Sequence, residues 1–194
     1  MTINRIDYVL EETFKVLDRV YRNAKSGTLN DEPGSRIVFP NKRSGEIRVS
    51  EQELRFVFVE QLNKYCDKTS WKIRYSVETP TDKPYNFSKN LSCESLDGRS
   101  AMFDLTVYDI DMRPICRIEF KAHNPEQHSY AKDILKLRTE CGDECVGYFV
   151  QMLEKEDKNT SENIREKISE SGEYSHIQYR CHTLLRESME RRNI

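Results

Sequence analysis

Two neighbouring stretches of alternating polar and apolar residues constrain the fold most strongly. They are SAMFDLTVYD (residues 100–109) and RPICRIEFKAHN (residues 113–124), separated by a short turn-like segment. Alternation with a period of two is typical of β-strands, in which successive side chains point to opposite faces. We therefore predict two adjacent strands with one face in the core. The residues predicted to face the core are Phe103, Leu105, Val107, Cys116, Ile118, Phe120 and Ala122.

The opposite face of these strands gathers charged side chains. Asp104 lies on the first strand, and Glu119 and Lys121 lie on the second. Two carboxylates on adjacent strands can bind one hard divalent cation, and Mg²⁺ favours such a site because it takes one or two carboxylates and keeps several waters. Lys121 would then orient or deprotonate a metal-bound water, or stabilise charge on a phosphate. The alternative is a solvated sheet face, since a Glu-x-Lys tripeptide alone is a weak signal.

The set Asp104, Glu119 and Lys121 resembles the motif of the PD-(D/E)XK nuclease superfamily, which has the restriction-endonuclease-like fold. The chain departs from that motif where Phe103 replaces the proline that often precedes the aspartate. The resemblance implies an α/β fold with an αβββαβ core, a mixed central sheet flanked by helices, and Mg²⁺ as cofactor with Mn²⁺ as a substitute. It also implies that Asp104, Glu119 and the carbonyl of Phe120 bind the metal, while Lys121 assists the water.

The expected element order places this core within residues 50–153. Apolar spacing of three and four predicts helices over residues 3–24 and from Ser50 onward, the second with a capping box. A short strand at 36–39, strands at 71–77, 145–153 and 174–181, a loop at 82–99, and helices at 125–140, 161–169 and 184–192 complete the prediction. We expect residues 1–49 to form an N-terminal helix and basic connecting arm, and residues 50–194 the nuclease-like domain, together one structural domain.

In the nuclease-like fold, the helix before the first core strand often supplies another carboxylate. Glu53 is the first candidate for this catalytic role, and Glu51 and Glu60 are the alternatives. Helical spacing brings Glu53 and Glu60 near one another, so the sequence does not separate them. A capping role alone also accounts for Glu53.

Candidate contacts to a nucleic-acid backbone lie in two regions. One is the connection before the second helix, and the other follows the second motif strand. The candidates are Lys42, Arg43, Arg48, His123, Lys132 and Lys136. A solvated surface role is the alternative for each of them.

The composition limits the class of protein. The 194 residues carry a net charge of −2, with 33% charged residues, so nucleic acid would have to meet a local basic patch. The sequence has no apolar run of about 18 residues, and acidic residues near the N-terminus argue against a signal peptide. We therefore expect a cytoplasmic protein without a membrane partner. Its six cysteines are expected to be reduced thiols.

The function predicted from sequence is a bacterial, metal-dependent deoxyribonuclease. The alternative is a catalytically silent nuclease-fold protein that binds nucleic acid or a protein partner in a defence or mobile-element system. The acidic net charge favours this alternative, whereas the intact Asp-Glu-Lys set favours the enzyme. A homodimer is expected from the resemblance alone.

Overall fold

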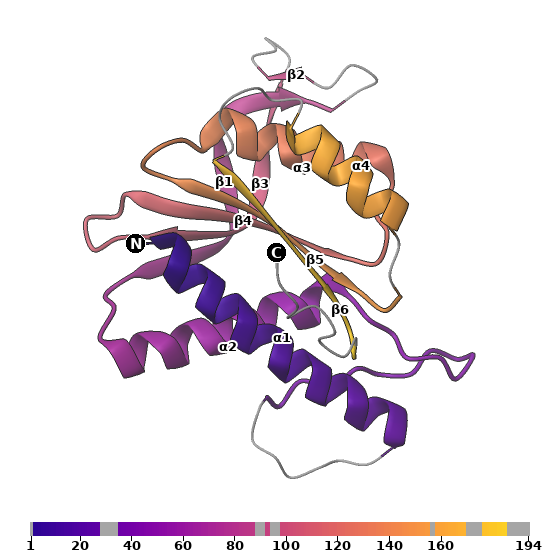
Figure 1. Ribbon diagram of the computed structural model, residues 1–194. Coiled ribbons are helices and arrows are strands. Elements are labelled where there is room, and N and C mark those ends of the chain that lie inside the picture. Colours follow the sequence, from indigo (N-terminus) through magenta and orange to yellow (C-terminus); the bar gives the residue numbers. More distant parts are fainter. Residues whose placement is uncertain are drawn as a thin grey trace, which may run out of the picture.

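The computed structural model describes residues 2–27, 35–87, 92–93, 98–155, 158–169 and 176–185. The helices are α1 (Thr2–Ser26), α2 (Glu51–Thr69), α3 (Gln127–Glu140) and α4 (Lys158–Ser169). The strands are β1 (Arg74–Asn86), β2 (Ser92–Cys93), β3 (Arg99–Tyr108), β4 (Pro114–Ala122), β5 (Val146–Leu153) and β6 (Ile177–Thr183). They form three layers, in which α1 and α2 cover one face of a sheet and α3 and α4 cover the other (Figure 1).

The sheet is mixed, and β4 joins its two halves. The strand order is β2-β1-β3-β4-β5-β6. Strands β2, β1, β3 and β4 pair antiparallel, whereas β4, β5 and β6 are parallel. Parallel neighbours require crossover connections, which α3 and α4 supply on the same face. Strand β4 therefore lies in the middle of the sheet, and its central residues are buried on both faces.

Each face of the sheet has its own hydrophobic core. The larger core joins α1 and α2 to β3, β4 and β5, and includes Leu17 of α1. In it, Phe58 of α2 packs against Phe120 of β4, with ring centroids 5.5 Å apart. The smaller core lies under α3 and α4 and includes Ile134 and Phe149. The two cores hold β5 from both sides, whereas β4 contributes apolar side chains only to the larger core.

The predicted α/β class and element order are confirmed. Residues 51–153 follow the order helix, three strands, helix, strand, with the two-residue β2 as an addition. An N-terminal helix precedes this part, and α4 and β6 follow it. Residues 36–39 do not form the predicted strand. The helix predicted at 184–192 lies outside the described residues from position 186 onward.

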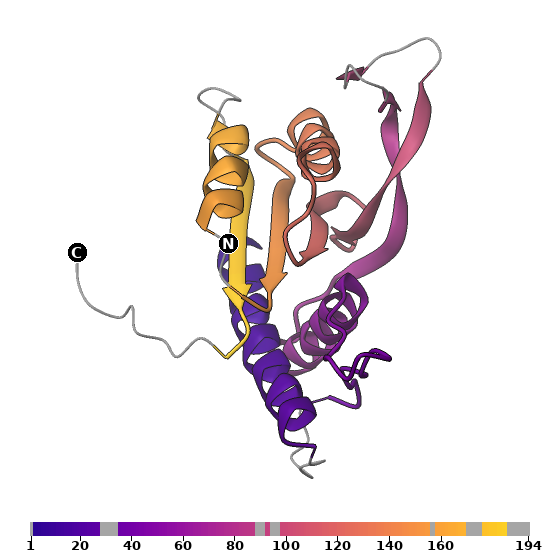
Figure 2. The same ribbon diagram turned by 90° about the vertical axis from the view of Figure 1, so that its right-hand side faces the viewer.

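Strand β1 is longer than predicted. The sequence indicated a strand at 71–77 followed by a loop over 82–99, but β1 runs from Arg74 to Asn86. It pairs with β3 on both sides of a register shift between Pro80 and Pro84. Figure 2 shows β1 and β3 extending together as an arm beyond β4, β5 and β6. Most side chains of β1 are exposed, which explains why hydrophobic alternation does not mark its full length.

The predicted common face of Phe103, Leu105 and Val107 is wrong for Phe103. Leu105 and Val107 belong to the core under α1 and α2, whereas Phe103 belongs to the core under α3. The change of face occurs at Asp104. The paired residues on either side of Asp104 place Glu78 of β1 opposite it, and Glu78 has a φ of 50°, far from extended geometry. Asp104 therefore lies where the local strand geometry is irregular.

The longest helix, α1, is amphipathic. Its buried residues recur every three or four positions, and its other faces carry charged side chains such as Lys15. Among the helices that the structure describes, none combines the length and apolar character of a membrane span. The buried face of α1 thus serves packing against α2 and the sheet.

Replacing Leu17 with Ala tests whether α1 is part of the shared core. The side chain of Leu17 is 0% exposed, so the substitution should lower the free energy of unfolding by about 2–5 kcal/mol. Lys15→Ala is the matched control on the exposed face, with an expected change below about 0.5 kcal/mol. Urea unfolding followed by circular dichroism measures both. A Leu17→Ala protein with unchanged stability would separate α1 from the core.

Candidate active site

Asp104 lies where the pairing between β3 and β4 ends. The paired residues extend to Leu105 and Ile118. Beyond them, the amide of Phe120 donates a 2.7 Å hydrogen bond to Oδ2 of Asp104, so this carboxylate replaces a backbone acceptor. The N–H and C=O of one strand residue point to the same side. The carbonyl of Phe120 therefore lies on the edge of β4 that faces Asp104.

Glu119 and Lys121 are held by two residues of α3. Nζ of Lys136 is 2.5 Å from Oε1 of Glu119 and 2.9 Å from Oδ1 of Asp133. Oδ2 of Asp133 is 2.8 Å from Nζ of Lys121. Asp133 thus bridges two lysines. The four side chains form one ion-pair network and are between 2% and 12% exposed.

Sequence analysis missed Asp133 and placed Lys136 on an exposed face. Lys136 was predicted to contact nucleic acid together with Lys132, but it is buried and also donates a 2.7 Å hydrogen bond to the carbonyl of Met102. Lys132 lies with its Nζ 5.5 Å from the ring centre of Phe87. The sequence feature that could have revealed this pair is the spacing of three between Asp133 and Lys136, which places both on one helix face. The sequence does not show that this face packs against β4.

Helix α2 brings Glu51, rather than Glu53, to this network. Oε1 of Glu51 is 3.8 Å from Nζ of Lys121. Glu53, the first sequence candidate, instead accepts a hydrogen bond from the hydroxyl of Ser50, the N-cap residue of α2. Glu60 is about 2.5 turns further along α2 than Glu51. Of the three candidates, the structure thus joins Glu51 to Lys121.

The network carries an excess of negative charge. Four carboxylates, those of Glu51, Asp104, Glu119 and Asp133, face two lysines, so the network with all four ionised has two negative charges in excess. Burial raises the pKa of Asp104 and Glu119, the latter well above its usual range, and the nearby Asp133 raises both further. Burial also raises the pKa of Glu51, with a further contribution from Asp104. A divalent cation carries the two positive charges that are missing.

Arg55 of α2 is a further charged residue beside Asp104, and sequence analysis did not consider it. Its Nη1 is 2.6 Å from Oε1 of Glu78 and 3.8 Å from Oδ1 of Asp104. Because Glu78 compensates Arg55, this pair adds no net charge to the network. It links α2 to β1 next to Asp104.

The oxygen donors suit Mg²⁺ in kind. The carboxylates of Asp104 and Glu119 and the carbonyl of Phe120 are the hard ligands that Mg²⁺ accepts. However, within the residues that the structure describes, no cluster of three or more His, Cys, Asp or Glu side chains has the arrangement of a metal site. The carboxylate of Glu119 contacts Lys136. Metal binding therefore requires Lys136 to share or release that carboxylate.

The predicted basic arm contains a small β-hairpin. A bridge joins Asn41 to Ile47, and the amide of Gly45 donates a 3.0 Å hydrogen bond to the carbonyl of Lys42 to close the turn. Lys42 and Arg43 are exposed in this turn. Nζ of Lys42 is 3.6 Å from a carboxylate oxygen of Glu46, so part of its charge is compensated within the hairpin.

His123 connects the end of β4 to the residues before α2. Its Nε2 is 2.8 Å from the carbonyl oxygen of Val49, to which it donates a hydrogen bond. Arg48, the residue before Val49, lies 3.3 Å from the carboxylate of Glu53. The structure therefore gives His123 a positioning contact within the chain. It brings the base of the hairpin close to the strand that carries Glu119 and Lys121.

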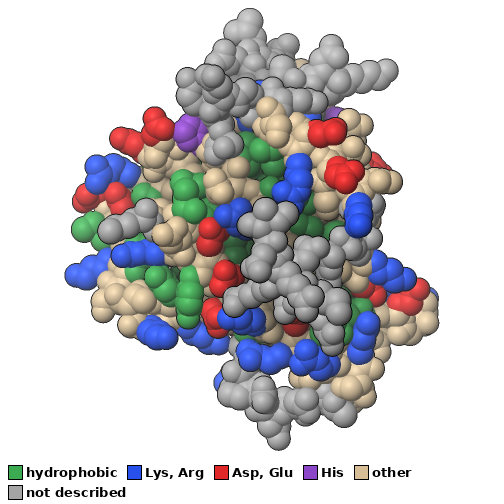
Figure 3. Space-filling view, viewed as in Figure 1, with side chains coloured by type: hydrophobic (Ala, Val, Ile, Leu, Met, Phe, Trp, Pro, Cys, Tyr) green, Lys and Arg blue, Asp and Glu red, His purple; other side chains and the backbone are tan. Residues whose placement is uncertain are grey.

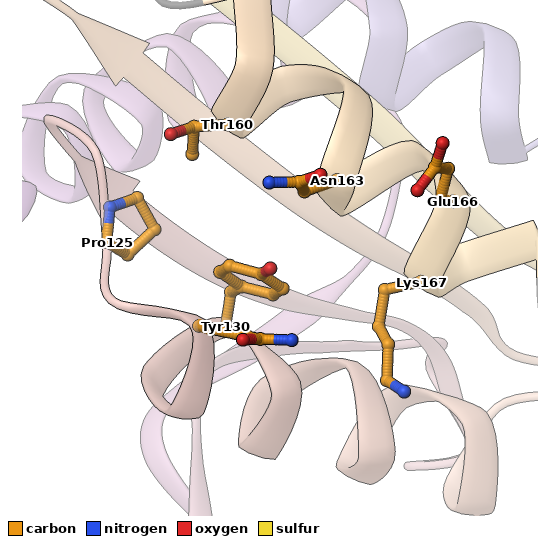
Figure 4. A pocket seen from close by; sticks show the side chains of 7 residues that line it. Pro125, Tyr130, Thr160, Asn163, Glu166 and Lys167 are labelled. Carbon is orange, nitrogen blue, oxygen red and sulfur yellow. The ribbon is translucent and has the colours of Figure 1, made fainter.

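A separate pocket lies between α3 and α4 (Figure 4). Its volume is about 260 Å³, and its lining residues are Pro125, Gln127, Tyr130, Thr160, Asn163, Glu166 and Lys167. The side chain of Asn163 points from α4 toward Tyr130 (Figure 4). The lining contains one carboxylate, that of Glu166, so the pocket lacks the paired acids of the network around Asp133.

No known family model matches this chain, and a search of curated proteins also found no match.

Replacing Asp104 with Asn should stabilise the metal-free protein at pH 7. The amide oxygen still accepts the hydrogen bond of Phe120, while a buried carboxylate with a raised pKa is removed. A carboxyl pKa raised on folding means that the native state binds more protons, so the wild type gains stability as pH falls from 7 toward 4. The difference between the two proteins should therefore shrink over that range.

Melting temperatures in the presence of a chelator, at pH 7 and at pH 5, measure this difference. Each kcal/mol corresponds to about 2–4 °C for a chain of this size. A stability gap that grows as the pH is lowered would contradict the assignment of a raised pKa to Asp104.

Proposed function

We propose that this chain is a Mg²⁺-dependent nuclease that hydrolyses DNA phosphodiester bonds. The observation that carries the proposal is the meeting of Asp104 and Glu119, from two adjacent strands, with Lys121 and with Glu51 of the preceding helix. Buried carboxylates in excess of their counter-ions are costly. A protein that only packs its core has no need for such a group, whereas a divalent cation offsets its cost.

We further propose that residues 51–153 form a restriction-endonuclease-like core. The order α2, β1, β3, β4, α3, β5 corresponds to αβββαβ, with β2 as an insertion. The mixed sheet also supports the assignment, because the three antiparallel strands β1, β3 and β4 are followed by a parallel crossover through α3. Asp104, Glu119 and Lys121 then lie on the strands that the resemblance requires.

In this proposal Asp104, Glu119 and the carbonyl of Phe120 would hold Mg²⁺. The ion, when bound, supplies an activated water and offsets phosphate charge. Burial alone would lower the pKa of Lys121, but Asp133 and Glu51 raise it above its ordinary value. Lys121 therefore stays protonated and acts by donating hydrogen bonds to the attacking water or to a phosphate oxygen. Asp133 positions Lys121 for this task.

Glu51 is the carboxylate best suited to receive the proton of the attacking water. Its side chain is 44% exposed, so it can reach solvent and substrate, and it lies 3.8 Å from Lys121. Partial burial of Glu51 raises the pKa of its carboxyl group, which makes it a better proton acceptor than an ordinary exposed carboxylate.

Contact with DNA would rely on local groups. Lys and Arg side chains are interspersed with Asp and Glu over the described part of the face in Figure 3, in line with the net charge of −2. The hairpin with Lys42 and Arg43 is the most exposed basic element joined to the site, through His123 and Val49. We assign phosphate contacts to this hairpin.

The second candidate function is a binding module that retains the fold without cleavage. The contact between Lys136 and Glu119 favours it, because a lysine neutralises one of the two carboxylates that the metal requires. In such a protein the network would be purely structural. Metal titration separates the two functions.

Replacing Lys121 with Ala should abolish most cleavage. Loss of one positioned donor to a developing charge costs at least about a hundredfold in rate. Plasmid and single-stranded DNA are incubated with purified protein and Mg²⁺, and the initial rates of cutting are compared. Lys15→Ala, on the exposed face of α1, is the matched control and should cut like wild type. Equal rates for Lys121→Ala and wild type would assign the cutting to another site or to a contaminant.

Addition of Mn²⁺ should raise the melting temperature of the wild type. A ligand at a hundred times its Kd stabilises the folded state by about 2.7 kcal/mol. The increase should disappear in Glu119→Gln, which removes one metal-binding charge. It should persist in Asp143→Asn, where the replaced side chain is 98% exposed. A wild type whose melting temperature does not respond to Mn²⁺ would favour the binding module.

A further inference from the structure

Two thiols lie close together at the C-terminal end of α3. Cys141 directly follows the helix, Cys145 directly precedes β5, and each thiol shifts the pKa of the other. Backbone hydrogen bonds run in both directions between Gly142 and Cys145, with lengths of 2.9 and 3.2 Å. They close the chain into a tight turn. The backbone itself therefore keeps the two cysteine residues close to each other.

Gly147 leaves the space that the sulfur of Cys141 occupies. A Cβ atom added at Gly147 would lie 3.1 Å from Sγ of Cys141 and 3.3 Å from a methyl carbon of Leu137. Gly147 is also the β5 residue paired with Arg117 of β4. The thiol pair is thus packed close to a guanidinium group.

Arg117 is a buried positive charge with spare hydrogen-bonding capacity. Its side chain is 7% exposed, and its terminal nitrogens contact Asp82 and Glu140 at 2.6 Å. Its Nε–H has no hydrogen-bond partner among the described residues. Such a group favours a negative charge on a neighbouring sulfur.

The pKa values of the two thiols shift in opposite directions. The hydrogen bond from Cys141 and the positive charge of Arg117 lower the pKa of Cys145. Burial and the negative charges of Asp82 and Glu140 raise it, and the net effect is a lowered pKa. The pKa of Cys141 is raised, first because its thiol donates that hydrogen bond and second because it is buried. A low-pKa thiol beside a second thiol is the arrangement found at redox-reactive cysteines.

We propose that Cys141 and Cys145 form a thiol-modification site at which a peroxide produces an intramolecular disulfide. The Cys145 thiolate attacks one peroxide oxygen, the O–O bond breaks, and hydroxide leaves, which gives a sulfenic acid on Cys145. The sulfur of Cys141 then attacks that of Cys145, the S–O bond breaks, and hydroxide leaves as the disulfide forms. Each hydroxide takes up one thiol proton. In total, two thiols are oxidised and one hydrogen peroxide is reduced to two waters.

Cys66 and Cys116 lack this combination of features. Cys116 is fully buried, and burial raises its pKa well above its usual range. Burial also raises the pKa of the partly exposed Cys66. The turn between Cys141 and Cys145, in contrast, reaches the surface, since Asp143 is 98% exposed. Cys141 is itself partly exposed, so the pair lies next to the surface, whereas Cys145 is buried behind it.

The modification would act on the anchor of the β1–β3 arm. Glu140, next to Cys141, accepts hydrogen bonds of 3.1 Å from the amides of Asp82 and Lys83 and one of 3.0 Å from the hydroxyl of Tyr85. A disulfide removes the thiolate from the surroundings of Arg117 and ties the end of α3 to the start of β5. This inference is independent of the proposed nuclease function.

The test is peptide mapping of the full-length protein after brief exposure to hydrogen peroxide at pH 7. Remaining thiols are alkylated, and the peptides are analysed by mass spectrometry. The peptide with Cys141 and Cys145 should lose two hydrogens and no longer be alkylated. Its oxidation should be at least about five times faster than that of Cys66. Equal or slower loss than at Cys66, or a disulfide that maps to Cys116, would overturn the proposal.

Cys141→Ser provides a second, independent measurement. It removes the attacking thiol of the second step, so the sulfenic acid of Cys145 should persist and be trapped by a carbon nucleophile such as dimedone. Failure to trap it in a folded variant, as judged by circular dichroism, would also count against the mechanism. Cys66→Ser is the matched control and should form the disulfide at the wild-type rate.

Discussion

The bridge formed by Asp133 between Lys121 and Lys136 is the interaction on which the candidate site depends. Glu119 is 2% exposed on the central strand, and a carboxylate in that position requires a partner because desolvation of an unpaired charge is very costly. Asp133 holds the lysine that supplies this partner and also holds the second lysine. The charged residues of β4 can therefore be buried only if α3 packs against the sheet and brings Asp133 and Lys136 to them.

Periodicity in the sequence was sufficient to predict the two strands that carry Asp104, Glu119 and Lys121. A period of two places Glu119 and Lys121 on one face without any knowledge of the rest of the chain. The neighbouring Asp104 follows from the adjacency of the two strands. These residues are close in sequence, so local geometry decides their relative positions.

The remaining parts of the site depend on packing between distant segments. Glu51 rather than Glu53 meets Lys121, because the rotation of α2 about its axis is set by its buried face and not by the capping pattern. Asp133 was missed because a helix pattern does not specify which strand the helix covers. The predicted face of Phe103 was wrong because β3 changes face at Asp104. Asp104 lies opposite Glu78 of β1, whose φ of 50° is an irregularity that alternation along β3 does not reveal.

Strand β1 has one consequence for the behaviour of the chain in concentrated solution. Between Arg74 and Pro84 it pairs with β3 along one side, and β2 pairs with it at Tyr85 and Asn86, beyond that segment. An open strand edge invites strand addition by a second molecule and hence aggregation. Pro80 and Pro84 lack the amide hydrogen that such an added strand needs, and the irregular backbone at Glu78 interrupts the row of acceptors. Within the described residues, this part of the β1 edge is thus protected against fibre-like growth.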